Sequence, residues 1–192
     1  MVNNPKLLAL IFLIFSHHGA IVKHGENKSN ANLSQTRRER LHQQDGFLQS
    51  ARPHLQLARI PGRYLYYITK YASKYHVRPS LPLAILMVEN GLFAGGSMAG
   101  AAHRVSNTGA IGPMQIEPGT AQFVRINPWD LKENIKGGVK YLRYLLQVFP
   151  NYKLAIAAYN MGPTFVSNHP ASAVKSMYVK MVLKAESFTH HI

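Results

Sequence analysis

The chain has 192 residues, a length that suits one folded domain with an additional segment better than two full domains. Hydrophobic residues make up 46% of it, enough for a sizeable core, and the absence of cysteine excludes disulfides, a thiol nucleophile and cysteine-based zinc sites. The 22 lysines and arginines against 8 acidic residues favour anionic partners, although a generally cationic solvated surface explains the same numbers.

The N-terminus has the pattern of an export signal. Lys6 precedes an uninterrupted apolar run over residues 7–15, and polar and small residues follow it. The run is well short of the about 20 residues that span a bilayer, so we expect a signal peptide at residues 1–20 and a periplasmic or secreted protein. His17 and His18 stand where a cleavage site prefers small residues, which leaves an uncleaved N-terminal anchor, and with it a membrane attachment, as the alternative.

A polar segment follows, over residues 21–55. It is rich in Asn, Gln, Ser and Arg and cannot bury much apolar surface, so we expect a linker there. A helix over residues 37–48 is compatible with its pattern. The folded domain is then expected over residues 56–192.

Within that domain, apolar residues recur at the spacing of helices, and no strand pattern of comparable strength occurs. The element after Pro61 and Gly62 ends before Pro79. The next, residues 80–88, has Ser80 as a candidate cap and is apolar on every side, which predicts a buried helix. Residues 91–112, rich in Gly, Ala and Ser, are expected to form a loop. Further helices are expected over residues 118–124, 134–149, 153–159 and 171–185.

Glu89 is the only acidic residue between Gly46 and Ile116, and it stands at the end of the buried helix. Loss of hydration disfavours the charged carboxylate, and the negative end of the helix dipole acts in the same direction, so we expect a raised pKa. A carboxyl group that keeps its proton near neutral pH can serve as a general acid in glycoside cleavage. The alternatives are that Glu89 pairs with Arg104 or another base, or points into water.

Four blocks in order give the region from Tyr64 to Leu183 a resemblance to the lysozyme-like domain of soluble lytic transglycosylases. They are the apolar helix that ends in Glu89; residues 106–116, SNTGAIGPMQI, followed by Pro118-Gly119-Thr120-Ala121; Asn134-Ile135, then Gly138, then Tyr141-Leu142; and residues 157–163, AAYNMGP. The resemblance covers roughly two thirds of the chain. It implies a mainly α, lysozyme-like domain with a glycan-binding groove and little or no sheet.

The resemblance also implies roles for single residues. Glu89 matches the catalytic acid/base, and Ser106 matches a serine that helps to place the reacting groups. Met114 and Gln115 match residues that line the groove, and Tyr159 matches a tyrosine that reaches towards the catalytic carboxyl. Asn160 lies beside it and is expected to bind substrate.

Each of these positions also has a structural interpretation. Tyr159 could be a core aromatic with a locally satisfied hydroxyl, Met114 a core residue and Gln115 a hydrogen-bonding loop residue. Gly109 and Gly112 are expected to be conformational, because glycine allows a tight loop.

The resemblance implies cleavage of the MurNAc-GlcNAc β-1,4 bond of peptidoglycan with one carboxyl group and formation of a 1,6-anhydroMurNAc end. Glu117 is a poor second acid, since it stands at a helix start, where an acid usually serves the dipole. A lysozyme-type hydrolase on the same scaffold and an inactive wall-binding scaffold subunit of a secretion or conjugation machine are the alternatives.

Peptidoglycan glycan strands are the expected partner, and a secretion, pilus or conjugation apparatus is a further candidate by analogy. Nucleic acid is not expected, because the basic residues form no dense patch and an export signal precedes the domain. The ten histidines show no ligand spacing, so neither a metal nor another cofactor is expected.

The sequence departs from the family pattern in four ways. Asn90 stands where the family usually has Ser, Pro113 replaces a common Leu, and Met161 replaces a common Ala. The span from Glu89 to Gly109 is some eight residues longer than usual, which suggests a flexible flap beside the acid.

Overall fold

The computed structural model describes residue 35, residues 38–39 and residues 57–189. The chain divides into two units, Met1–Phe47 and Leu48–Ile192. Of the first unit, only residues 35 and 38–39 are described, and they are helical. The expected signal at 1–20, and the linker and the helix at 37–48 apart from those few residues, therefore lie outside the described part of the chain.

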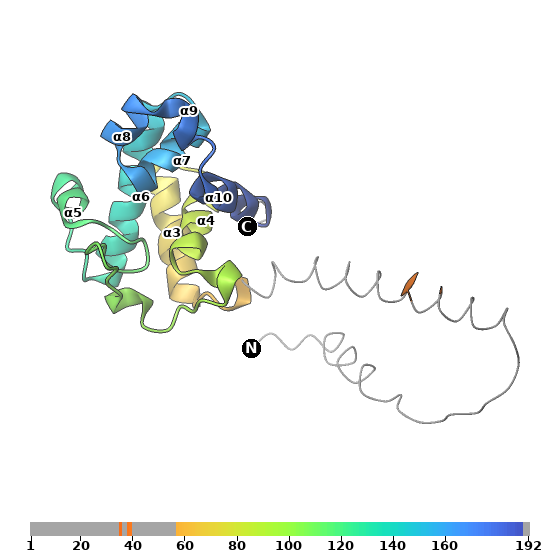
Figure 1. The fold of residues 1–192 in the computed structure, drawn as a ribbon. Helices are drawn as coiled ribbons and strands as arrows, with labels where there is room; N and C mark the ends of the chain where they lie inside the picture. The colour runs from red at the N-terminus through yellow and green to blue at the C-terminus, as the bar shows by residue number, and fades with distance from the viewer. Residues whose placement is uncertain (1–34, 36–37, 40–56, 190–192) are drawn as a thin grey trace, which may run out of the picture. The chain divides into compact units, whose positions relative to one another are not determined.

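The described part of the second unit is a helical domain, and Figure 1 shows how its helices gather around α3, α4 and α6. Its segments are α3 (Gly62–Tyr75), α4 (Ser80–Glu89), the short 3-10 turns η1 (Leu92–Ala94) and η2 (Ala101–His103), α5 (Pro118–Val124), α6 (Leu131–Val148), α7 (Tyr152–Met161), α8 (Pro163–Asn168), α9 (Pro170–Ala173) and α10 (Met177–Ser187).

Helix α4 lies in the middle of the core, as its apolar sequence predicts. Every residue from Ser80 to Met87 is buried. The helix packs against α10 on one side and against α3 and α6 on others. A helix enclosed in this way has a fixed C-terminal end, so the residue at that end, Glu89, has a fixed position.

The structure contains no regular strand within residues 57–189. Two isolated bridges, Val105 with Ile111 and Ile111 with Ile116, fold residues 105–116 into a compact loop. This agrees with the expected mainly α, lysozyme-like class with little or no sheet. No helix among the described residues is long and apolar enough to cross a membrane.

One predicted helix cap and one predicted helix start are wrong. Ser80 does not cap α4: Pro79 occupies the cap position, and the Ser80 hydroxyl instead donates to the carboxylate of Glu186 at 2.9 Å. Helix α6 starts at Leu131, three residues earlier than expected, because the Asp130 carboxylate accepts the backbone N–H of Glu133 at 2.8 Å.

The expected single helix over residues 171–185 is also wrong. The chain forms α9, leaves the helical path, and starts α10 at Met177, where the Ser176 hydroxyl caps it by accepting from the Val179 N–H. The expectation also missed α8, which starts at Pro163. The apolar spacing carried on across the break, so periodicity alone could not locate it.

A buried polar cluster fixes α10 to the rest of the domain. The Glu186 carboxylate is only 4% exposed, and it accepts the Ser80 hydroxyl and the Tyr152 phenol, the latter at 2.7 and 2.8 Å to its two oxygens. Hydrogen bonds to a charged group are the stronger kind. The cluster therefore holds α10, and any side chain that α10 contributes to the site, against α4 and α7.

Candidate active site

The carboxyl group of Glu89 is mostly buried at the end of α4, and its direct partner is a tyrosine. The hydroxyl of Tyr178, in the first turn of α10, donates to Glu89 Oε1 at 2.6 Å. No base pairs with Glu89 among residues 57–189, and Arg104 bonds to Asn90 instead. The alternatives in which Glu89 pairs with Arg104 or points into water are therefore wrong.

Burial raises the pKa of Glu89, and the hydrogen bond from Tyr178 opposes that rise because it stabilises the charged form. The direction agrees with the prediction from the sequence. Burial, together with the charge of Glu89, also raises the pKa of Tyr178 and of Tyr159 well above the ordinary value, so both phenols keep their protons. The site thus holds one acid that favours its proton and two neutral phenols beside it.

Tyr159 lies close enough to Glu89 to feel its charge, but its hydroxyl donates to the backbone carbonyl of Met114 at 2.9 Å. It therefore joins α7 to the loop of residues 109–116. The direct partner of the acid is Tyr178, which sequence reasoning treated only as an apolar position of the last helix. No spacing signal relates residues 89 positions apart, so only the fold could bring them together.

The loop beside the acid is fixed by the buried side chain of Asn134, on α6. Its amide group donates to the carbonyls of Ile111 and Pro128, and its oxygen accepts the N–H of Met114. Gly112, at φ 75°, passes so close that a Cβ there would lie 2.4 Å from Asn134 Nδ2. This explains in contact terms why Gly112 and Asn134 occur together in the recognised blocks.

Asn90 connects the acid's helix to two loops. Its amide group donates to the carbonyls of Leu86 and Pro113, at 2.7 and 2.9 Å, and its oxygen accepts the Arg104 guanidinium at 2.8 Å. Arg104 in turn donates to the carbonyls of Ser97 and Ala99. The long segment 91–108, which the sequence predicts to be a flexible flap, is thus hydrogen-bonded through Arg104 to the residue next to Glu89.

Ser106 and Glu117 belong to a separate hydrogen-bond chain. The Ser106 hydroxyl accepts the N–H of Ala110 at 3.0 Å and bonds to the Thr108 hydroxyl at 2.9 Å. Thr108 also donates to Glu117 at 3.1 Å. Glu117 occupies the position before α5 without a side-chain cap bond, so its carboxylate serves this chain rather than the site of Glu89.

The other expected groove residues differ in exposure. The side chain of Met114 is fully buried against Gly138, so here it is a core residue, and its carbonyl accepts the Tyr159 hydroxyl. Gln115 is partly exposed at φ 46°, and its amide donates to the Gly112 carbonyl. Asn160 is exposed at the end of α7.

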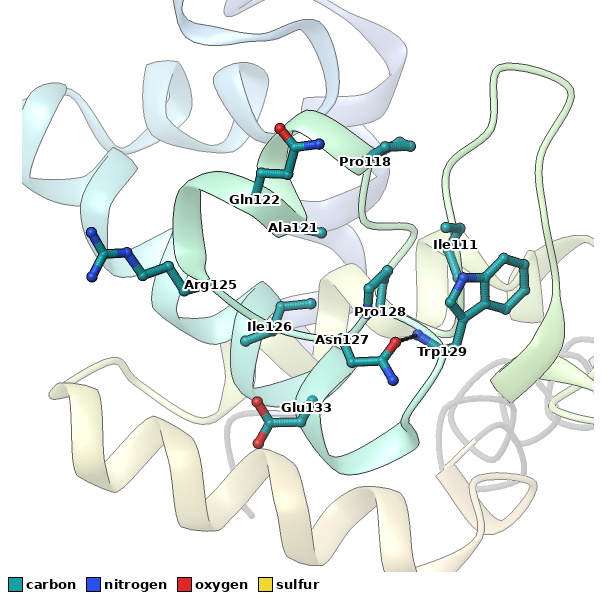
Figure 2. A pocket seen from close by; sticks show the side chains of 10 residues that line it. All are labelled: Ile111, Pro118, Ala121, Gln122, Arg125, Ile126, Asn127, Pro128, Trp129 and Glu133. Atoms are coloured by element: carbon teal, nitrogen blue, oxygen red, sulfur yellow. Dashed lines mark hydrogen bonds between the residues drawn. The ribbon is translucent and has the colours of Figure 1, made fainter.

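A cavity of about 640 Å³ lies elsewhere, between α5, the turn after it and the start of α6. Figure 2 shows Trp129 at its edge beside Ile111, with Arg125 and Glu133 on the far side. Neither Glu89 nor a tyrosine lines it. Within the described residues, no group of three metal-binding side chains occurs.

Comparison with known proteins matches residues 66–182 to the transglycosylase SLT domain family. The match covers more than half of the chain and includes all four blocks from Glu89 to Tyr159. The chain belongs to this family. Tyr178 also falls inside the matched region.

Solved structures of lytic transglycosylases are similar to the chain as well. The 70-kDa soluble lytic transglycosylase of Escherichia coli is 26% identical over 77% of this chain (TM-score 0.53), and a complex of the 70-kDa enzyme with bulgecin A is 27% identical over 68% (TM-score 0.54). An inactive glutamate-to-glutamine mutant of Slt from Pseudomonas aeruginosa shares the fold at 23% identity over 69% (TM-score 0.53). The chain spans only 24–29% of the length of these structures.

Proposed function

We propose that this SLT-family domain is a peptidoglycan lytic transglycosylase in which Glu89 is the only acid/base. Protonated Glu89 donates its proton to the glycosidic oxygen between MurNAc and GlcNAc, and that C–O bond breaks. The N-acetyl group of MurNAc stabilises the positive sugar. The Glu89 carboxylate then takes the proton of the C6 hydroxyl as its oxygen bonds to C1, which gives a 1,6-anhydro end and consumes no water.

The observation that carries this proposal is the isolation of Glu89 from other carboxyl groups. Ordinary glycosidases use two carboxyl groups across the scissile bond. The other four acids between residues 57 and 189 are occupied: Glu117 with Thr108, Asp130 as a cap, Glu133 with Lys136 and Glu186 in the α10 cluster. Burial raises the pKa of Glu89, and the hydrogen bond from Tyr178 lowers it.

Tyr178 has a defined part in this scheme. Its hydroxyl donates to Glu89 Oε1, so it stabilises the carboxylate that forms after the first proton transfer. Burial stabilises the protonated form of Glu89 before the transfer, and the Tyr178 hydroxyl stabilises the carboxylate form after it. We assign substrate contacts to Ser106, Gln115, Tyr159 and Asn160, and a supporting role to Met114 through its backbone.

The test is the chemistry of the products. Purified peptidoglycan digested with the protein should release muropeptides with 1,6-anhydroMurNAc ends, lighter by one water than hydrolysis products in mass spectrometry. Reducing ends in their place would favour the lysozyme-type hydrolase. No release of either product, with the folded protein bound to the wall, would favour the scaffold alternative.

The domain arrangement belongs to the same proposal. A signal at residues 1–20, or an anchor in its place, would take the protein to the periplasm or the outside, and the linker at 21–55 would separate it from the catalytic domain. A secretion, pilus or conjugation apparatus is the setting in which local opening of the wall would be used.

A further inference from the structure

A row of aromatic rings leads from Tyr159 to the surface. The ring centroids of Tyr159 and Tyr141 are 5.7 Å apart, those of Tyr141 and Phe123 6.4 Å, and those of Phe123 and Tyr144 4.9 Å. Tyr141 is buried, but Phe123 is 57% exposed and Tyr144 37% exposed. Two large rings therefore meet solvent at the end of the row that begins at Tyr159.

These rings surround a small cavity of about 180 Å³, lined by Gly119, Thr120, Phe123, Tyr141, Tyr144 and Pro163. Its walls come from α5, from α6 and from the first residue of α8. Pro163 ends the AAYNMGP block that contains Tyr159 and Asn160. The cavity therefore shares Tyr141 with the row of rings that begins at Tyr159, and it lies next to the block that contains Tyr159.

The lining of this cavity carries no charged side chain, although the chain as a whole has a net charge of +14. Such a lining offers nothing specific to a phosphate or a carboxylate. It offers flat ring faces, and the phenol of Tyr144 as a hydrogen-bonding group beside them. An uncharged ligand with one apolar face and several hydroxyl groups fits this chemistry, and a sugar ring is such a ligand.

The opposite face of α5 provides a contrast. Residues 119, 120 and 123 line the aromatic cavity, whereas residues 118, 121, 122 and 125 line the larger cavity beside Trp129. At 3.6 residues per turn these two sets lie on opposite sides of the helix. Trp129 is 51% exposed, which is similar to Phe123, but it lines the larger cavity and not the aromatic one. It therefore serves as a control for Phe123.

We propose that Phe123 and Tyr144 form a distal subsite that binds a sugar ring of the glycan strand away from the bond that is cleaved. This rests on the proposed function, because a glycan is the substrate it assumes. The subsite adds affinity for long strands and takes no part in the chemistry at Glu89. It also predicts a length requirement, since only a strand that reaches from Glu89 to these rings can use it.

The experiment measures binding to the full chain with Glu89→Gln, which separates recognition from cleavage. Oligomers of β-1,4-linked N-acetylglucosamine, from dimer to octamer, are titrated by calorimetry into this protein and into the same protein with Phe123→Ala, Tyr144→Ala or Trp129→Ala. We expect Phe123→Ala and Tyr144→Ala to weaken binding of the long oligomers by roughly tenfold each, the loss of one stacked ring. Trp129→Ala should change nothing, and Phe123→Tyr should retain affinity.

Each outcome decides the matter. Equal affinities for Phe123→Ala and Trp129→Ala, an equal loss for short and long oligomers, or no binding at all would overturn the subsite. Circular dichroism of each variant checks the fold, which should survive because both rings are exposed. If the length-dependent loss appears while the parent protein releases no anhydro product, the subsite stands and the proposed function fails.

Discussion

Glu89 combines two opposing influences on one proton. Burial at the end of α4 removes water from the carboxyl group of Glu89 and raises its pKa, whereas the hydrogen bond from Tyr178 stabilises the charged form and lowers the pKa. An acid/base that must give and then recover a proton needs both states within reach. The balance between α4, which buries the acid, and α10, which supplies the phenol, is therefore the property to test by mutation.

Tyr178→Phe removes the group that stabilises the Glu89 carboxylate. The pKa of Glu89 should then rise further, and a general acid is active while it keeps its proton, so the high-pH decline of the pH–rate profile should move to higher pH. The maximal rate should fall roughly tenfold or more, because a hydrogen bond to a charged group contributes about 1.5–3 kcal/mol. Rates of wall clearing across pH measure both effects.

Tyr66→Phe is the matched control, because Tyr66 is an exposed phenol on α3. It should leave the profile unchanged. A profile for Tyr178→Phe that coincides with the parent, or moves to lower pH, would contradict the assigned role of the hydroxyl.

Gly112→Ala tests the packing of the loop under the site. The added Cβ would meet Asn134 within 2.4 Å and would hold alanine at a positive φ of 75°. We expect a loss of about 2–4 kcal/mol in the free energy of unfolding. Gly109→Ala, at φ 93° with no atom within 4 Å of its Cβ, should cost only the backbone term, about 1–2 kcal/mol. Urea denaturation compares the two, and equal losses would refute the contact argument.

At the scale of elements, the hydrogen bond from Arg104 to Asn90 holds the long loop of residues 91–108 against the end of α4, next to Glu89. Asparagine offers two donors and an acceptor, and all three are used here, whereas a serine in its place would have one donor on a shorter side chain. Asn90 and the loop that carries Arg104 therefore belong to one hydrogen-bonded contact.

Arg104→Ala should release the loop without unfolding the domain. Amide hydrogens in residues 91–108 should exchange about tenfold faster, because opening of the segment no longer breaks bonds worth about 1 kcal/mol each. Hydrogen exchange with mass spectrometry locates the change. Lys132→Ala, which removes the same charge at an exposed position of α6, is the control. Unchanged exchange in the loop would show that the hydrogen bonds of Arg104 do not stabilise it.

The sequence predicted helices well where one signal, such as a proline or an apolar run, was strong. It predicted them poorly where apolar spacing and a helix cap indicated different boundaries. Helix α5 has the predicted bounds because Pro118 starts it, and α4 is buried as its composition requires. The prediction of a single helix over residues 171–185 was wrong, because the apolar spacing continued across the turn before Ser176. A cap that breaks a periodic pattern is visible only when the tertiary contacts on both sides are known.

At the scale of the whole molecule, the sequence predicted the mainly α class, because four blocks in order carried the family pattern. It also predicted the direction in which the pKa of Glu89 is shifted, because that residue ends an apolar helix. It did not predict that Tyr178 is the partner of Glu89, nor that Met114 is enclosed. Both depend on how distant helices pack, and periodicity describes only one helix at a time. The structure therefore shows which of these residues contact one another, which the sequence alone could not predict.

The most direct test of the central claim is the rate at which the parent protein and Glu89→Gln clear a suspension of purified cell walls. Glutamine keeps the size of the side chain but cannot give up and recover a proton, so we predict a loss of about 10³-fold or more, with the variant as well folded as the parent by circular dichroism. Clearing by Glu89→Gln at the rate of the parent would contradict the account.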